Sequence, residues 1–160
     1  MRTCLQFWRR IQLKRLTTRS QFQAVLAGPT VARTTHFALH CVALNGPVAI
    51  QETLESSLPP KPELFGVKDV WMGAMVPKRW AKRAVTRNAI KRQIYSVSAS
   101  FESALPKAAH VLRLRASFDR IEFPSATSQL LKASVRSELL QLFASALARP
   151  YLPKAQLGAT

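Results

Sequence analysis

The fold is decided by residues 70–101, which read VWMGAMVPKRWAKRAVTRNAIKRQIYSVSASF. The first seven of these residues are apolar enough to form a strand that is buried on both faces. Helical spacing follows, since apolar residues recur at intervals of four, three and four and form one stripe. The stripe comprises Ile90, Ile94, Val97 and Phe101. The stretch therefore predicts a buried strand, a short connection and a helix that packs by one face.

The same stretch is strongly basic. Seven of the fifteen residues from Lys78 to Arg92 are Lys or Arg, and none is acidic. At about 100° per residue, the polar helix residues fall on the flank and far side of the apolar stripe. Basic helix faces are often merely solvated, but such density without a neighbouring acid favours binding to backbone phosphates. The residues expected to bind nucleic acid are Lys78, Arg79, Lys82, Arg83, Arg87, Asn88, Lys91 and Arg92.

The elements on either side complete an α+β chain. A helix is expected over 17–27, and strands are expected over 36–44 and 110–116. A long loop, 47–69, contains four of the eight acids of the chain, and this acidity suggests that the loop does not touch a polyanion. A last helix is expected over 125–148. The order is α-β-β-α-β-α, which predicts a small mixed sheet packed against helices.

The chain as a whole is cationic. Its 160 residues carry 24 Lys and Arg against eight Asp and Glu, a net charge of +16, and 48% of them are hydrophobic. We expect a single domain over 15–148, between a basic N-terminal tail (1–14) and a C-terminal tail (149–160). A charge excess of this size repels itself in a compact fold and indicates a polyanionic partner.

Three features bear on where the protein acts. Cys4 and Cys41 are too few for a disulfide framework and have no metal-binding spacing, which favours reduced thiols in the cytoplasm. No run of 18 apolar residues is present to span a membrane. Residues 1–51 contain no acid, as in a mitochondrial transit peptide. A mitochondrial RNA-binding protein is therefore an alternative to the expected cytoplasmic one.

Four segments, taken in order, resemble the bacterial ribonuclease P protein family. Residues 86–92, TRNAIKR, resemble its signature helix, which runs Arg-Asn-Arg, one apolar residue and Lys-Arg. Residues 76–84 are similar to the lead-in to that helix, residues 15–25 to the N-terminal helix and residues 37–40 to the first strand. The likeness spans about 15–147, and the resemblance implies an architecture like that of ribosomal protein S5.

The chain departs from the family pattern at Ala89, which stands where the signature usually has its third residue, an arginine. The missing contact would have to come from elsewhere, such as Lys82 or Arg83. The loop 47–69 also exceeds the usual hairpin of the family.

The resemblance implies a protein subunit that binds a catalytic RNA and assists it in cutting precursor tRNA. The RNA would carry the catalysis with Mg²⁺ held chiefly by RNA, the protein would contribute no catalytic or metal-binding residue, and one monomeric protein would bind each RNA. The 5′ leader of the precursor would lie in a cleft of the sheet. Residues expected to line that cleft are Phe22, Phe37, Arg33, Arg113 and Arg115.

The two aromatic residues of this cleft have a second interpretation, because their spacing is equally typical of a core. Leu26 and His40 occupy positions where the family has further aromatics, so cations would carry more of the leader binding. The sequence shows no acid pair, Ser-His-Asp set or acidic metal cluster. The rival function is that of a structural nucleic-acid-binding protein of the ribosomal or nucleoid type, which composition alone does not exclude.

Overall fold

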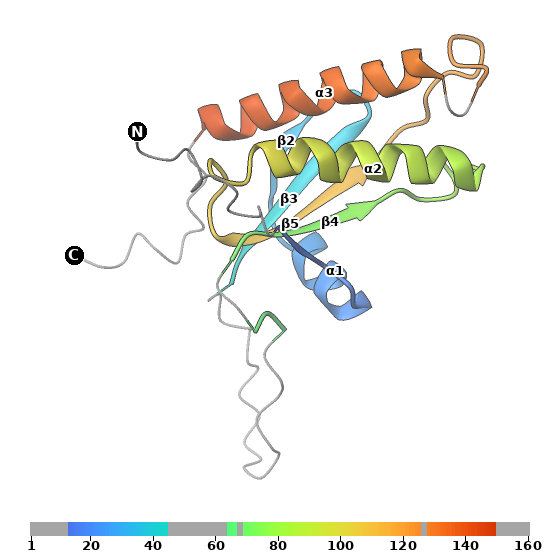
Figure 1. Cartoon of the computed structure of the whole chain (residues 1–160). Helices are drawn as coiled ribbons and strands as arrows, with labels where there is room; N and C mark the ends of the chain where they lie inside the picture. The colour runs from blue at the N-terminus through green and yellow to red at the C-terminus, as the bar shows by residue number, and fades with distance from the viewer. Residues whose placement is uncertain (1–12, 45–63, 67–68, 126–127, 150–160) are drawn as a thin grey trace, which may run out of the picture.

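The computed structural model describes residues 13–44, 64–66, 69–125 and 128–149, which form one five-stranded sheet with three helices (Figure 1). The elements are β1 (Lys14–Arg15), α1 (Arg19–Leu26), β2 (Thr30–Arg33), β3 (Phe37–Ala43), β4 (Trp71–Met75), α2 (Ala84–Ser100), β5 (Ala108–Leu114) and α3 (Gln129–Ala148). Most of the expected tails and of the loop 47–69 lies outside the described residues.

The sheet is mixed, as the sequence predicts. Its strand order is β1-β4-β5-β3-β2, in which β1, β4 and β5 are parallel and the pairs β5–β3 and β3–β2 are antiparallel. Helices α2 and α3 lie side by side over one face of the sheet, and α1 lies against the other face (Figure 1). The expected α+β class is therefore confirmed.

The expected element order needs one correction, because the structure adds two strands. Strand β1 has only two residues, too few for any periodicity, and its backbone pairs with β4 through the Lys14 N–H, which donates to the Val70 carbonyl at 3.0 Å. Strand β2 pairs with β3. It was not predicted because it directly follows Gly28-Pro29, a dipeptide typical of a turn. The order is therefore β-α-β-β-β-α-β-α rather than α-β-β-α-β-α.

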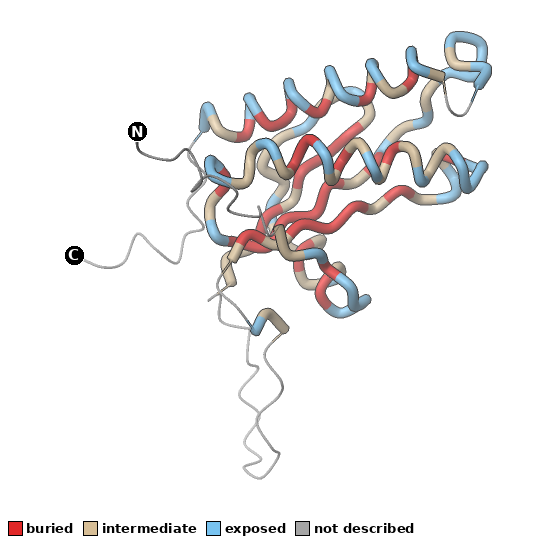
Figure 2. The backbone as a smooth tube through the Cα atoms, viewed as in Figure 1, coloured by how far each residue is buried: buried red, intermediate tan, exposed pale blue. Residues whose placement is uncertain are grey.

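Alternate strand residues face two different layers. On the side of α2 and α3 the large core contains Phe37, Leu39, Leu112 and Phe143, none of which is exposed to solvent. The other side holds a smaller cluster around Val25 of α1. The central strands are therefore buried on both faces along most of their length, as Figure 2 shows.

Helix α1 approaches the sheet closely because β4 carries a glycine there. A Cβ atom on Gly73 would lie 2.6 Å from the Phe22 ring and 2.8 Å from the Leu16 side chain. The helix begins with a capping box, in which the Thr18 hydroxyl accepts from the Gln21 N–H and the Gln21 side chain accepts from the Thr18 N–H. The cap and the close approach together fix Phe22 over β4.

Candidate nucleic-acid interface

The connection between β4 and α2 carries the densest positive charge, and one arginine braces it. The Arg87 Nη1 atom donates to the Ala81 carbonyl at 3.0 Å and to the Lys82 carbonyl at 2.7 Å. At the start of the connection, the Pro77 carbonyl accepts from the Trp80 and Ala81 N–H groups. Arg87 thus holds the connection against the first turn of α2, and this fixes the positions of the cations on the connection.

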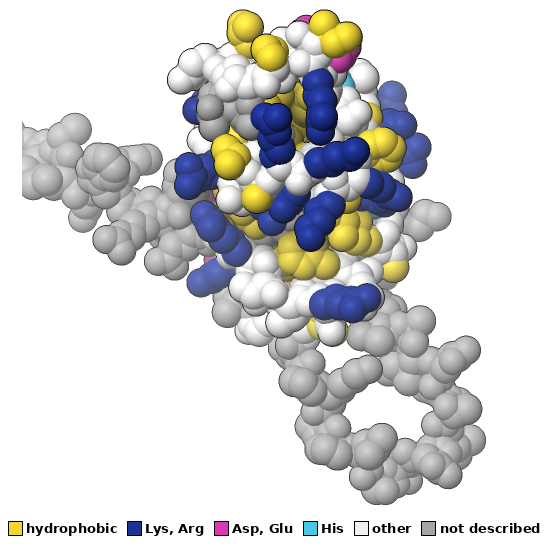
Figure 3. Space-filling view, turned by 90° about the vertical axis from the view of Figure 1, so that its right-hand side faces the viewer, with side chains coloured by type: hydrophobic (Ala, Val, Ile, Leu, Met, Phe, Trp, Pro, Cys, Tyr) yellow, Lys and Arg dark blue, Asp and Glu magenta, His cyan; other side chains and the backbone are white. Residues whose placement is uncertain are grey.

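The structure brings all eight expected RNA-binding residues onto this connection and the first turns of α2. Six are exposed, and Arg87 and Lys91 are half-buried. Figure 3 views the molecule toward this end and shows Lys and Arg gathered over it, with hydrophobic side chains between them. The exposed six are Lys78, Arg79, Lys82, Arg83, Asn88 and Arg92. We call the eight residues the basic face.

The N-terminus of α2 adds to the positive field of the basic face. Its N-cap residue is Arg83, which makes no side-chain cap hydrogen bond, and no acid lies in the first turn. By contrast, α1 and α3 have the side-chain caps Thr18 and Ser128. The unneutralised positive end of the α2 dipole therefore reinforces the attraction for anions.

One further cation of this region was missed from sequence. The Arg15 guanidinium lies over the Tyr95 ring, 4.2 Å from its centroid, and joins β1 to the flank of α2. The residues are 80 positions apart and β1 has no periodicity of its own, so no local pattern marks them as partners. The contact widens the cationic surface beyond the signature segment.

On the opposite side of the sheet, two expected leader-cleft cations flank a small residue. Arg33 of β2 pairs with Ala38 of β3, Ala38 pairs with Arg113 of β5, and Arg113 pairs with Met75 of β4. Paired residues on neighbouring strands share a face, so these four form one row across the sheet, which we call the arginine row. Arg33 is exposed, and Arg113 is half-buried with its Nε atom unpaired.

His40 lies in the next row on the same face, and the charges of both arginines affect the pKa of its imidazole. Burial lowers the pKa of the His40 imidazole, the Gly28 backbone raises it to a smaller extent, and the charges of Arg113 and Arg33 lower it further. Its Nδ1 atom lies 3.5 Å from the Thr30 hydroxyl. The lowered pKa favours the neutral imidazole, so His40 adds little positive charge beside the arginine row.

Arg115 lies just beyond the arginine row. Its N–H donates to the His36 carbonyl at 2.8 Å, and its guanidinium donates to the Thr34 carbonyl at 3.3 Å. The side chain is exposed but partly engaged in holding the β2–β3 turn. All three expected leader-cleft arginines therefore lie at one end of the sheet.

The two expected cleft aromatics do not lie together, which corrects the placement of Phe37. Phe37 faces α2 and α3, is not exposed at all and packs against Phe118, with ring centroids 6.1 Å apart. A ring enclosed on that side of the sheet has no face on which a base can stack. Phe22 is half-buried on the α1 side, so Phe22 alone has the position expected of a platform.

No metal or membrane site emerges from the described ranges. Groups of three or more His, Cys, Asp or Glu side chains placed to hold an ion do not occur there. The same part of the chain contains no helix long and apolar enough to cross a membrane. His110 lies in the core with no exposed surface, and this burial lowers the pKa of its imidazole to about 4, which keeps the ring neutral.

Comparison with known proteins shows related sequences. The family model described as Ribonuclease P matches residues 12–138. The ribonuclease P protein component of Ralstonia pickettii is 32% identical over 129 residues, which cover 81% of this chain and 76% of that protein. The component from a Nostoc species is 33% identical over 97 residues, covering 59% and 66% respectively.

Solved structures show the same fold. The ribonuclease P protein of Staphylococcus aureus superposes with a TM-score of 0.55 at 16% identity, covering 82% of this chain and 94% of that one. At this identity the likeness concerns the fold, whereas the family match and the Ralstonia relative concern the sequence. Together with the ordered signature segments, they show that the chain belongs to the ribonuclease P protein family.

Proposed function

We propose that the chain acts as the protein component of ribonuclease P and binds the catalytic RNA of that enzyme through the basic face. The observation that carries this proposal is the acid-free connection that Arg87 holds against α2. Neutralising phosphates releases counterions, so each contact contributes to affinity and to its salt dependence. The family match supports the choice of RNA partner.

The leader of the precursor tRNA is assigned to the other side of the sheet. The arginine row offers one cation on each side of Ala38, and cations along an open face can hold the phosphates of a single strand. Phe22 lies over β4 on the same face and offers a ring to one base. The two RNA partners are thus received on different surfaces, and one monomer per catalytic RNA suffices.

Cleavage itself is assigned to the RNA. Mg²⁺ takes oxygen ligands, chiefly carboxylates in proteins, and the described residues do not fit it, because they hold no acidic cluster. We therefore place the magnesium ions on RNA phosphates and assign this chain the binding and alignment of the two RNAs. The product would be tRNA with a mature 5′ end.

Reconstitution tests the proposal. The purified chain is added to a bacterial ribonuclease P RNA and a precursor tRNA at low Mg²⁺, where the RNA alone cleaves poorly, and cleavage at the mature 5′ end is expected to return. A variant with Lys82, Arg83, Lys91 and Arg92 changed to Ala should fail to restore it. A matched pair removes two cations each: Lys82→Ala with Arg92→Ala should impair cleavage, whereas Lys132→Ala with Arg136→Ala, two cations of α3, should not.

The alternative is a structural nucleic-acid-binding protein. Such a protein would bind the RNA and unrelated duplexes with similar affinity and would leave cleavage at low Mg²⁺ unchanged. That outcome, with a folded protein, would overturn the proposed function.

A further inference from the structure

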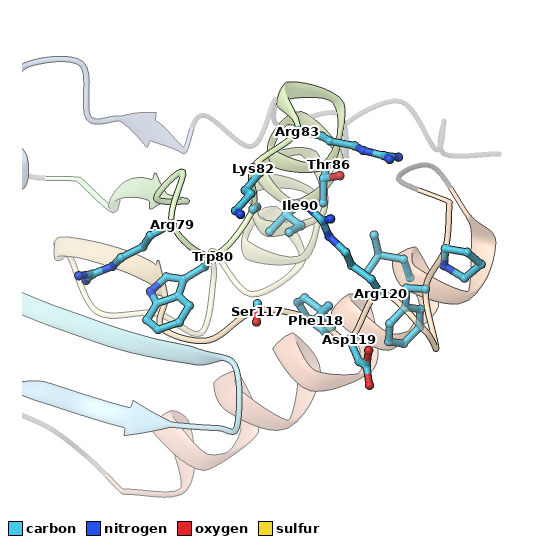
Figure 4. Close-up of a pocket in the computed structure, with 14 residues that line it drawn as sticks. Arg79, Trp80, Lys82, Arg83, Thr86, Ile90, Ser117, Phe118, Asp119 and Arg120 are labelled. Carbon is cyan, nitrogen blue, oxygen red and sulfur yellow. The ribbon is translucent and has the colours of Figure 1, made fainter.

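A pocket of about 550 Å³ opens on the α2 and α3 side of the sheet, beside the basic face. Its walls come from the connection after β4, the first turns of α2, the segment 117–124 and the start of α3 (Figure 4). It lies across the sheet from the arginine row, because its floor residues Ile90 and Leu131 belong to the core on the helix side. The proposed leader site therefore does not include it.

The pocket combines an aromatic and apolar floor with a cationic rim. Three aromatic residues line it, namely Trp80, Phe118 and Phe123, and the latter two rings meet edge to face at 5.9 Å. Four cations also line it, and none forms an ion pair with an acid in the part of the chain that the structure describes. These are Arg79, Lys82, Arg83 and Arg120.

The one acidic residue that lines the pocket, Asp119, forms a hydrogen bond within its own segment. The Asp119 Oδ1 atom accepts from the Ile121 N–H at 2.9 Å and closes the turn of the segment 117–124. Figure 4 shows Arg120 reaching from this segment toward Thr86 and Ile90 of α2, while the Asp119 carboxylate points to the opposite side. The charge of Arg120 is thus available inside the pocket.

Trp80 contributes an indole ring to the wall of the pocket. Its Nε1 atom is buried and has no hydrogen-bond partner among the described residues, although buried indole N–H groups are nearly always paired. The Arg79 guanidinium lies 5.3 Å from the centroid of the same ring. An indole ring beside a cation suits a partner that offers a flat base and a negative charge.

We propose that this pocket receives an unpaired nucleotide of the catalytic RNA, with its base against the aromatic floor and its phosphate held by Arg120, Lys82 and Arg83. Pockets of this volume accommodate a small polar and aromatic group, and RNA is recognised chiefly through bases splayed from its helices. The catalytic RNA is the source, because two of the three cations belong to the basic face. The inference rests on the proposed function and deepens it.

Fluorescence tests where the base goes. The chain has three tryptophans, Trp8, Trp71 and Trp80, so Trp8→Phe with Trp71→Phe leaves Trp80 as the single reporter. Adding the catalytic RNA should quench or shift Trp80 emission, whereas a single-stranded leader oligonucleotide should leave it unchanged. An equal response to the leader alone, or an unchanged spectrum while the RNA is bound, would overturn the proposal.

Affinity tests the phosphate contact. Arg120→Gln should weaken binding of the catalytic RNA about tenfold and lower the salt slope by about one. Arg136→Gln makes the same charge change on an exposed part of α3 away from the pocket and should have little effect. Equal effects of the two variants would reduce Arg120 to a distant charge and overturn the site.

The two proposals fail in different ways. If the unaltered chain does not restore cleavage, the proposed function fails. If it restores cleavage while Trp80 is silent and Arg120→Gln behaves like Arg136→Gln, the pocket assignment alone fails.

Discussion

The basic face and the arginine row are both cationic, yet they are built in different ways. The basic face lies on one continuous stretch of chain, 77–92, whose shape Arg87 fixes through two backbone carbonyls. The arginine row draws Arg33, Ala38 and Arg113 from three strands that are far apart in sequence. The basic face therefore depends on hydrogen bonds within its own segment, whereas the arginine row depends on the register of the sheet.

The largest effect should come from the core beneath the arginine row. Phe37 and Ala38 are consecutive but face opposite sides of the sheet, so Phe37→Ala should cost about 3–5 kcal/mol of unfolding free energy. Phe37→Leu keeps most of the volume and should cost less. Denaturant unfolding measures both changes. A stable Phe37→Ala protein that has lost only leader binding would put Phe37 back in the cleft.

Acid should weaken the fold through His110, which faces the helix side of β5. Its folded-state pKa of about 4 lies below the usual 6.5, so the unfolded chain binds the proton more readily. The stability is present above about pH 6.5 and falls by about 3 kcal/mol as the pH drops toward 4. Unfolding midpoints measured across this range should fall less steeply in His110→Asn. Identical pH slopes in both proteins would contradict the assignment.

Variants of Arg87 test whether its side chain stabilises the connection or only contacts a phosphate. Arg87→Ala removes a charge and two hydrogen bonds to the connection, so affinity for the catalytic RNA should fall about 100-fold. Arg87→Lys restores the charge but lacks the planar fork, and should recover the salt slope with only part of the affinity. RNA titrations at several salt concentrations measure this. Full recovery by Lys would show that only the charge matters.

The smallest effect should appear at Phe22. Phe22→Leu keeps the apolar packing over Gly73 but removes the ring face, and stacking one base is worth about 1–3 kcal/mol. Binding of precursor tRNA by the assembled complex should weaken about tenfold, while mature tRNA should bind as before. Equal losses for both substrates would mean that Phe22 serves only the packing of α1.

Local patterns identified the basic helix well. The stripe of Ile90, Ile94 and Val97 is fully buried, as its spacing predicts, and the predicted cations surround it. Strand β2 and the two-residue β1 were missed, since each forms only because a neighbouring strand offers free backbone groups. Periodicity within a short segment carries no information about such pairing.

The residues of the candidate sites also differ in whether local sequence patterns could predict them. Arg113 was expected from the alternation of its strand, but its position beside Ala38 and Arg33 depends on the register of three strands. Trp80 and Arg120 are 40 positions apart, and they line one pocket because the segment 117–124 returns to the start of α2. Nothing in the sequence near Arg120 marks it as part of a site.

The sequence by itself determined the α+β class, the basic helix and the kind of partner, because helical periodicity and uncompensated charge are properties of neighbouring residues. Only the tertiary structure decided which face each aromatic serves: Phe37 joins the core and Phe22 the open side. It also decided that Arg87 holds the connection against α2 and that Arg120 lines a pocket together with residues of the basic face. These outcomes depend on contacts between distant segments, which form only when the sheet fixes its strand order and register.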